Sequence, residues 1–307
     1  MTQLQPDPAR RAWLVAALAV AAAPRVSAAA PKDLLTRRIP RADEALPVVG
    51  LGSWITFNVG TDSVARAGCT EVVRAFFAAG GRLIDSSPMY GSSQPTLGHA
   101  LAQLGHPPAL FAADKVWVGD ADRGAAQIEA SRAHWGVRRF DLLQVHNLDA
   151  WQGHLPRLIA MKAEGRLRYV GVTTSHGRRH AELEQVMRTQ PIDFVQLSYN
   201  LVDRDAERRL LPLAQERGIA VIVNRPFQGG RLLQSLAPHR LPGWAAEIAC
   251  DGWAQAALKF IVSHPAVSCA IPATSQVAHL RQNMGAATGP LPDAALRARM
   301  AAAVAAL

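Results

Sequence analysis

The chain has 307 residues, of which 49% are hydrophobic and 19% are charged. This length and composition suit one large domain with a substantial core and exclude a disordered chain. The net charge of +9 comes mostly from scattered arginines, and without a clustered basic stripe it does not indicate a nucleic-acid-binding protein. The three cysteines form no C-x-x-C pair, and no spacing of His, Cys and acidic residues predicts a metal site.

The N-terminus differs from the rest of the chain. Arg10 and Arg11 precede an apolar stretch at 12–23, and small residues follow up to Ala30. This order is typical of a secretory signal peptide, with an uncleaved helix as the alternative. We expect residues 1–30 to be the signal and 31–307 to form a single domain.

The Arg10–Arg11 pair resembles a bacterial twin-arginine export signal and implies a periplasmic protein, or a cytoplasmic one if the signal is not used. The apolar stretch that follows is too short to span a membrane, so we expect no stable span after signal removal.

Apolar runs and helical patterns alternate along the remaining chain. Strands are expected at 46–54, 83–85, 110–116, 140–146, 167–173, 194–197, 219–223 and 267–271. Helices are expected at 70–79, 96–104, 121–135, 151–164, 179–188, 204–217, 251–263 and 276–287. The Ala-rich tail from Asp293 is a candidate for one more helix.

This alternation predicts a parallel sheet, since each short apolar strand is followed by a helix at repeats of roughly 25 to 30 residues. Eight such repeats predict an α/β protein with the (β/α)8 (TIM) barrel fold. An open doubly wound sheet is disfavoured, because Gly50-x-Gly52 lacks the third glycine and the following helix of a dinucleotide fingerprint.

Four polar side chains stand at successive strand ends. Asp85 ends the second strand, Tyr90 lies on the next loop, Lys115 ends the third strand and His146 ends the fourth. Each alone has an ordinary explanation, such as a packed turn tyrosine, a helix cap, a solvated lysine or a rim histidine. Together they predict a catalytic site, because the active site of a (β/α)8 barrel lies at the carboxyl ends of its strands.

Nearly all of the mature chain, from Gly50-Leu51-Gly52 to Asn283, resembles the aldo/keto reductase superfamily. The resemblance rests on Ile84-Asp85-Ser86-Ser87-Pro88-Met89-Tyr90-Gly91, Lys115-Val116-Trp117, Asp141-Leu142-Leu143-Gln144-Val145-His146-Asn147, Tyr169-Val170-Gly171-Val172-Thr173-Thr174, Val195-Gln196-Leu197-Ser198-Tyr199-Asn200, Ile271-Pro272 and His279-Leu280-Arg281-Gln282-Asn283. It implies a barrel that binds NADPH, less often NADH, in extended form and reversibly reduces an aldehyde or ketone.

The resemblance also implies a role for each of the four residues. A carbonyl that accepts hydride develops negative charge on its oxygen and needs a proton donor and an electrostatic clamp. Tyr90 is the expected acid. The pKa of a free phenol is ~10, and the Lys115 ammonium is expected to lower it. Asp85 is expected to hold Lys115, and His146 to orient the carbonyl oxygen.

Cofactor contacts follow from the same resemblance. The carboxamide-binding residues correspond to Thr173, Thr174 and Gln196. The remaining expected contacts are Gly52, Ser53, Asn224, Arg225, Pro226, Phe227, Thr274, Ser275, His279, Gln282 and Asn283.

Several of these positions depart from the family pattern. Asn224-Arg225-Pro226-Phe227 lacks the usual nicotinamide-stacking aromatic, and Ala273 replaces a Lys or Gly. His279 replaces an arginine found in members that prefer NADPH, and Gln282 replaces a glutamate. These departures weaken the expected preference for NADPH and leave NADH open.

The substrate pocket is expected to include Trp54, Phe57, Trp117 and Asn147, because they follow strand ends; rim packing is the alternative. We expect a small-molecule carbonyl substrate, no nucleic-acid partner and a monomer. The alternative function is a catalytically weak or non-catalytic binding protein in the periplasm. The altered cofactor positions favour that alternative, and the intact catalytic set opposes it. A metal-dependent lyase or hydrolase is disfavoured because the chain offers no ligand cluster.

Overall fold

The computed structural model describes residues 33–307, so the predicted export signal lies outside the described residues. Eight parallel strands form one sheet in which each strand pairs with its neighbour in the chain. They are β3 (Leu51–Gly52), β4 (Leu83–Asp85), β5 (Phe111–Val116), β6 (Leu142–Val145), β7 (Tyr169–Thr173), β8 (Phe194–Ser198), β9 (Ala220–Asn224) and β10 (Val267–Ala270). Parallel bridges from Val49 to Ala270 and from Gly52 to Ala273 close the sheet. The predicted (β/α)8 barrel is confirmed.

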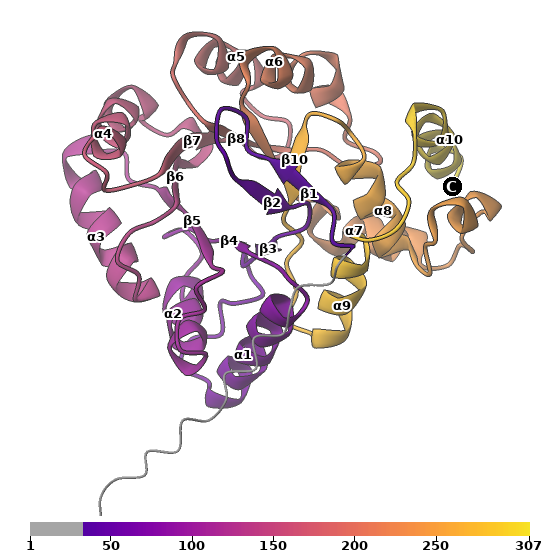
Figure 1. The fold of residues 1–307 in the computed structure, drawn as a ribbon, viewed down its shortest axis with the longest axis horizontal. Helices are drawn as coiled ribbons and strands as arrows, with labels where there is room; N and C mark the ends of the chain where they lie inside the picture. Colours follow the sequence, from indigo (N-terminus) through magenta and orange to yellow (C-terminus); the bar gives the residue numbers. More distant parts are fainter. Residues whose placement is uncertain (1–32) are drawn as a thin grey trace, which may run out of the picture.

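Helices form a ring around this barrel (Figure 1). They are α1 (Ser63–Ala78), α2 (Ser93–Gln103), α3 (Gly124–Trp135), α4 (Trp151–Ala163), α5 (His180–Thr189), α6 (Leu210–Arg217), α7 (Arg231–Leu236), α8 (Trp253–Val262), α9 (Val277–Gly285) and α10 (Ala294–Ala305). Helix α1 contacts both α2 and α9, so helices from near the two ends of the chain lie side by side. Within residues 33–307, no helix has the length and apolar character needed to cross a membrane.

Barrel closure explains the two glycines of the Gly50-x-Gly52 motif. A Cβ atom on Gly52 would lie 2.7 Å from the carbonyl oxygen of Ile271, and one on Gly50 would lie 2.8 Å from that of Leu83. Real Cβ atoms essentially never come this close to a neighbour. The motif therefore allows the first strand to approach both of its neighbours closely, β4 at Gly50 and the end of β10 at Gly52.

An antiparallel hairpin of β1 (Thr36–Arg38) and β2 (Ala45–Pro47) precedes the barrel. Leu46 was expected in the first barrel strand but lies in this hairpin instead. Ile39 and Leu46 are buried in one cluster with inward-facing barrel side chains such as Phe111. Figure 1 shows the hairpin, in indigo, across the middle of the barrel. It fills the barrel interior from the amino-terminal ends of the strands.

Glu44 ties the hairpin to the barrel. Its carboxylate accepts hydrogen bonds from Arg82 Nη2 at 2.9 Å, from Tyr169 Oη at 3.0 Å and from Arg168 Nη2. Burial raises the pKa of Glu44, but the bonds from Arg82 and Tyr169, together with the charges of Arg168 and Arg82, outweigh it, so the net pKa is lowered. Arg82 and Arg168 directly precede β4 and β7. The ion pairs therefore lie at the end of the barrel opposite the predicted site.

Element boundaries differ from the predictions where side chains cap helices. Helix α1 begins at Ser63, ahead of the predicted start at Thr70, because the Asp62 carboxylate accepts the amides of Val64 and Ala65 at 2.9 Å each. The expected helix at 204–217 is a short 3-10 turn followed by α6. Helix α7 was not predicted.

Candidate active site

A cavity of about 490 Å3 opens at the carboxyl ends of the strands. Its volume falls within the range of small-molecule binding sites. Asp85, Tyr90 and His146 line its base. Lys115 lies directly behind them, only 1% exposed.

The four predicted catalytic residues meet here. Lys115 Nζ lies 2.5 Å from Asp85 Oδ2 and 5.1 Å from the centroid of the Tyr90 ring. The Tyr90 ring in turn packs edge-on against His146, with centroids 5.8 Å apart. Consecutive strand ends therefore bring together an ammonium, a carboxylate, a phenol and an imidazole.

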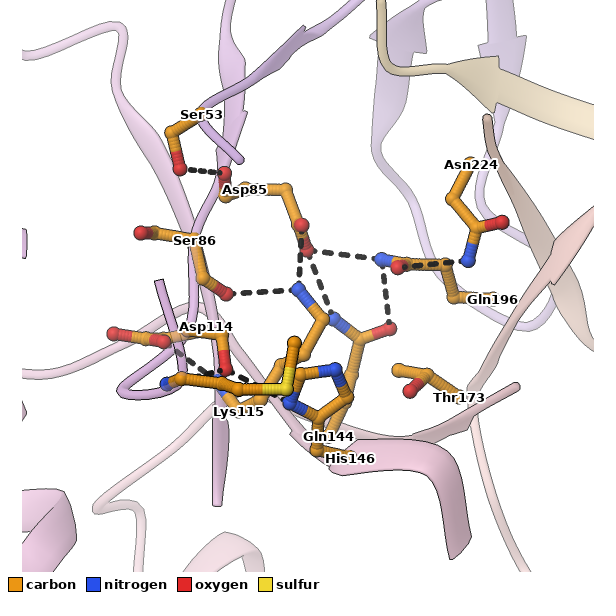
Figure 2. A network of polar contacts seen from close by, with 12 residues as sticks. Ser53, Asp85, Ser86, Asp114, Lys115, Gln144, His146, Thr173, Gln196 and Asn224 are labelled. Carbon is orange, nitrogen blue, oxygen red and sulfur yellow. Dashed lines mark hydrogen bonds and ion pairs between the residues drawn. The ribbon is translucent and has the colours of Figure 1, made fainter. Parts of the chain in front are cut away.

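Further hydrogen bonds surround the buried Lys115–Asp85 ion pair (Figure 2). Lys115 Nζ also donates to the Ser86 carbonyl at 2.8 Å. Asp85 Oδ1 accepts hydrogen bonds from Gln144 Nε2 at 3.2 Å and from Gln196 Nε2 at 2.9 Å. A buried ion pair is favourable only when such bonds offset its desolvation.

Gln144 was not predicted as a site residue. The signal was available, because Gln144 lies two residues before His146 in the same strand region and strand side chains alternate between faces. It also lies opposite Lys115 in the register of β5 and β6. Gly171 is the next residue in register, and its missing side chain leaves room: a Cβ there would lie 3.2 Å from Gln144 Cγ.

Burial and charge act in opposite directions on Lys115 and Tyr90. Burial disfavours the Lys115 ammonium, but the charges of Asp85 and Tyr90 outweigh it and the pKa of Lys115 is raised. Burial raises the pKa of Tyr90, and Lys115 lowers it by less, so the net pKa is above its ordinary value. The expected influence of Lys115 is present, but it reduces rather than reverses the effect of burial. Tyr90 therefore holds its proton at neutral pH.

His146 is a neutral imidazole over the working pH range. Burial and the nearby Lys115 ammonium lower its pKa to about 3. Its Nδ1 lies 2.8 Å from Ser87 Oγ, a second unpredicted contact. The rest of the ring faces the cavity.

A chain of side-chain amides continues from Asp85 across β8 and β9 (Figure 2). Asn224 Nδ2 donates to Gln196 Oε1 at 3.3 Å and to the Thr174 carbonyl at 2.9 Å, while Ser198 Oγ donates to Asn224 Oδ1 at 2.7 Å. Thr173 joins Gln196 and Asn224 in the cavity wall. Thr173, Gln196 and Asn224, all predicted cofactor contacts, thus form one polar edge of the cavity.

Positive charge gathers at the mouth of the cavity. His176 and Arg225 line the mouth, and Arg178 and Arg231 act on both of them. Burial is the largest cause that lowers the pKa of His176 and of Arg225, and the charges of Arg178 and Arg231 lower both pKa values further. Among the ion pairs of residues 33–307, none involves Arg178, Arg225 or Arg231. Asp203 opposes part of this charge at Arg225, but the three arginines outnumber it, and a net positive surface favours an anionic ligand.

The other predicted contacts divide between the cavity and its surroundings. Residues at the cavity include Gly52, Trp54, Asn147, Pro226, Phe227, Thr274, His279, Gln282 and Asn283. Ser53 and Thr174 are buried behind its wall, where Ser53 Oγ donates to the Asp85 carbonyl at 2.8 Å. Ser275 is exposed and outside the wall. The Trp117 ring is 6.5 Å from that of His146, at the rim.

Phe57 does not line the cavity, and its assignment to the substrate pocket is wrong. Its side chain is fully buried in the main core. The chain turns back at this point, since the Phe57 amide donates to the Ser53 carbonyl at 3.1 Å. Trp54 and Ile55 stand at the mouth instead, with 39% and 62% of their surface exposed. Ile55 was not predicted, because a single apolar residue in a loop gives no signal of its direction.

Asp114 is a second buried carboxylate beside Lys115, and it was not predicted. Its Oδ1 accepts the Lys115 amide at 2.7 Å, and its Oδ2 accepts Gln94 Nε2 at 2.7 Å. Gln94 Nε2 also donates to Ser131 Oγ at 2.9 Å. Asp114 thus faces α2 and α3, away from the cavity. Burial is the main cause that raises the pKa of Asp114 to about 7.

Comparison with known proteins agrees with this geometry. The sequence profile of the aldo/keto reductase family matches residues 48–302, so the chain belongs to that family. The predicted family and the predicted enzyme class, a nicotinamide-dependent oxidoreductase, are confirmed.

Three individual proteins illustrate this similarity. The chain is 29% identical over 250 residues to methylglyoxal reductase YeaE of Escherichia coli, covering 78% of this chain and 85% of that protein. It is 26% identical over 247 residues to the NADH-specific methylglyoxal reductase of the same organism, covering 68% and 73%. An aldo-keto reductase from Klebsiella pneumoniae, solved in complex with NADPH, shares the fold with a TM-score of 0.74 and 23% identity, over 88% of this chain and 95% of that one.

We predict that Asp114→Asn changes the pH dependence of stability. Because the folded-state pKa of Asp114, about 7, exceeds its ordinary value of 3.8, its stabilising contribution is complete below that ordinary value and is lost as the pH rises through 7. Between pH 4 and pH 8, the wild type should therefore lose on the order of 2–4 kcal/mol more of its free energy of unfolding than the variant does.

Urea unfolding at several pH values measures this difference. All other titrating groups are common to both proteins, so the wild type itself is the control. The Gln94 amide can rotate to present its oxygen to the new amide. Parallel curves of unfolding free energy against pH would contradict the prediction.

Proposed function

We propose that this protein reduces an aldehyde or ketone to an alcohol, reversibly, with NADPH or NADH as the hydride donor and Tyr90 as the proton donor. The observation that carries the proposal is the buried Lys115–Asp85 ion pair, set directly behind Tyr90 and His146 at the base of a cavity of ligand size.

The cavity fits a nicotinamide dinucleotide in its polarity. The unpaired cations Arg178, Arg225 and Arg231 complement a diphosphate, and the polar edge near Gln196 and Asn224 complements a carboxamide. When bound, the cofactor supplies a hydride. One relative is named as NADH-specific and one solved neighbour contains NADPH, which supports both candidates.

In the proposed mechanism, His146 positions the carbonyl oxygen near the Tyr90 hydroxyl. Tyr90 then donates its proton to that oxygen as negative charge develops there. The Lys115 ammonium stabilises the phenolate that remains, and Asp85 keeps Lys115 in place. The burial that raises the pKa of Tyr90 also removes water, which strengthens each of these electrostatic interactions. The reverse reaction uses the Tyr90 phenolate as base.

A small aldehyde is the first substrate to assay. Two relatives are named as methylglyoxal reductases, which supports methylglyoxal as a candidate. Trp54, Ile55 and Trp117 give the mouth an exposed apolar rim that also suits a larger aldehyde.

For its location, we propose export to the periplasm, supported by Arg10, Arg11 and the apolar stretch that follows them. Cell fractionation with an Arg10→Lys/Arg11→Lys double variant tests this. Periplasmic wild type and retained variant are expected, whereas a cytoplasmic wild type would contradict export.

We predict that Tyr90→Phe lowers turnover by about 10²- to 10⁴-fold, because the proton donor is lost. Cofactor affinity should stay within about twofold of the wild-type value, since the substitution removes a single hydroxyl. Steady-state kinetics with methylglyoxal and quenching of tryptophan fluorescence measure the two quantities. Tyr169→Phe is the control, because Tyr169 contacts Glu44 at the opposite end of the barrel. Undiminished turnover in Tyr90→Phe would rule out the mechanism.

We also predict that Arg225→Gln weakens NADPH and NADH binding about tenfold, because a charge-assisted contact to phosphate is lost. Arg138→Gln removes the same charge from an exposed position just before β6, at the other end of the barrel, and should leave both affinities unchanged. Fluorescence titration compares the variants. Equal affinities in both would contradict the assignment of the mouth cations, and no binding to the wild type would favour the non-catalytic binding protein.

A further inference from the structure

Ser87 is a fully buried serine at the active site to which the proposed mechanism gives no role. It lies on the loop between β4 and α2, three residues before Tyr90. Its Oγ has two partners: the amide of Met89 donates to it at 3.2 Å, and His146 Nδ1 lies 2.8 Å away. The direction of the second bond determines which nitrogen of His146 carries the proton.

Counting protons settles that direction. A neutral imidazole has one N–H and one lone pair. The Ser87 hydroxyl has one proton to donate, and His146 Nδ1 is the one acceptor that the described residues place within reach of it. If Nδ1 donated instead, the buried Ser87 proton would have no acceptor, which is unfavourable. The arrangement that satisfies every group has Ser87 Oγ–H donating to Nδ1.

The opposite edge of the imidazole then carries the N–H. Since Nδ1 faces the buried Ser87 and the His146 ring lines the cavity, Nε2 is the edge toward the substrate. An N–H there donates a hydrogen bond to a carbonyl oxygen. The other tautomer would present a lone pair to that oxygen and repel it.

We propose that Ser87 is a positioning residue that fixes His146 in the tautomer with its proton on Nε2, and so supplies the hydrogen bond that orients the substrate carbonyl. The catalytic consequence rests on the proposed reductase function, whereas the tautomer itself does not. The charge state agrees, because burial and Lys115 keep His146 neutral, with a pKa of about 3.

The test is 15N NMR of the histidine-labelled full-length protein, with the His146 signals assigned from their loss in His146→Gln. The wild type should show a protonated Nε2 and an unprotonated Nδ1. In Ser87→Ala the constraint is lost, so both tautomers should be populated. In the same variant kcat/KM should fall about 10- to 100-fold, while the Kd for cofactor stays unchanged.

Ser268→Ala is the matched control, because Ser268 is also a buried serine and its hydroxyl accepts the Val221 amide at 3.1 Å, away from the site. It should leave the tautomer and kcat/KM at their wild-type values. A wild-type His146 protonated on Nδ1, or a Ser87→Ala protein with unchanged tautomer and kcat/KM, would overturn the proposal. The wild-type spectrum needs no substrate, and its assignment needs only His146→Gln, so it tests the tautomer even if the reductase function fails.

Discussion

The buried ion pair between Lys115 and Asp85 is the constraint that organises this end of the barrel. Two charges that are almost completely removed from water are tolerated only when the surrounding groups bond to them. Gln144 and Gln196 supply that bonding to Asp85, and the Ser86 carbonyl supplies it to Lys115. The adjacent strands therefore have to end in register with polar side chains directed inward, and these same strand ends place Tyr90 and His146 beside the ammonium.

The two ends of the barrel serve different purposes, one structural and one for ligand binding. At the amino-terminal end, the β1–β2 hairpin fills the interior, and Glu44 bonds to Arg82 and Arg168. At the carboxyl end, the interior is left open as a cavity with unpaired cations at its mouth. The hairpin contacts at the amino-terminal end are thus separate from the carboxyl end, where free space and a net positive charge are available to ligands.

Much of this arrangement was predictable because it follows from alternation along the chain. Strands that alternate with helices predict the barrel, and polar residues that close apolar runs predict Asp85, Lys115 and His146. Features that depend on where a side chain or strand points in the fold were not predicted, or were predicted wrongly. Phe57 turns into the core, β1 was not predicted, and the end of β2 was read as the start of the first barrel strand. Asp114 and Ser87 were missed because their partners are distant in the chain. A signal for Asp114 was available, because it precedes Lys115 in the strand, so it must face the helices and requires a buried partner there.

The measurement that tests the central claim most directly is the turnover of the double variant Asp85→Asn/Lys115→Met. Removing both charges avoids leaving one of them buried and unpaired, so the protein should fold and bind cofactor. The account predicts that its turnover with an aldehyde falls by about three orders of magnitude, because Tyr90 loses the ammonium that stabilises its phenolate. Turnover within tenfold of the wild-type value in the folded, cofactor-bound variant would contradict it.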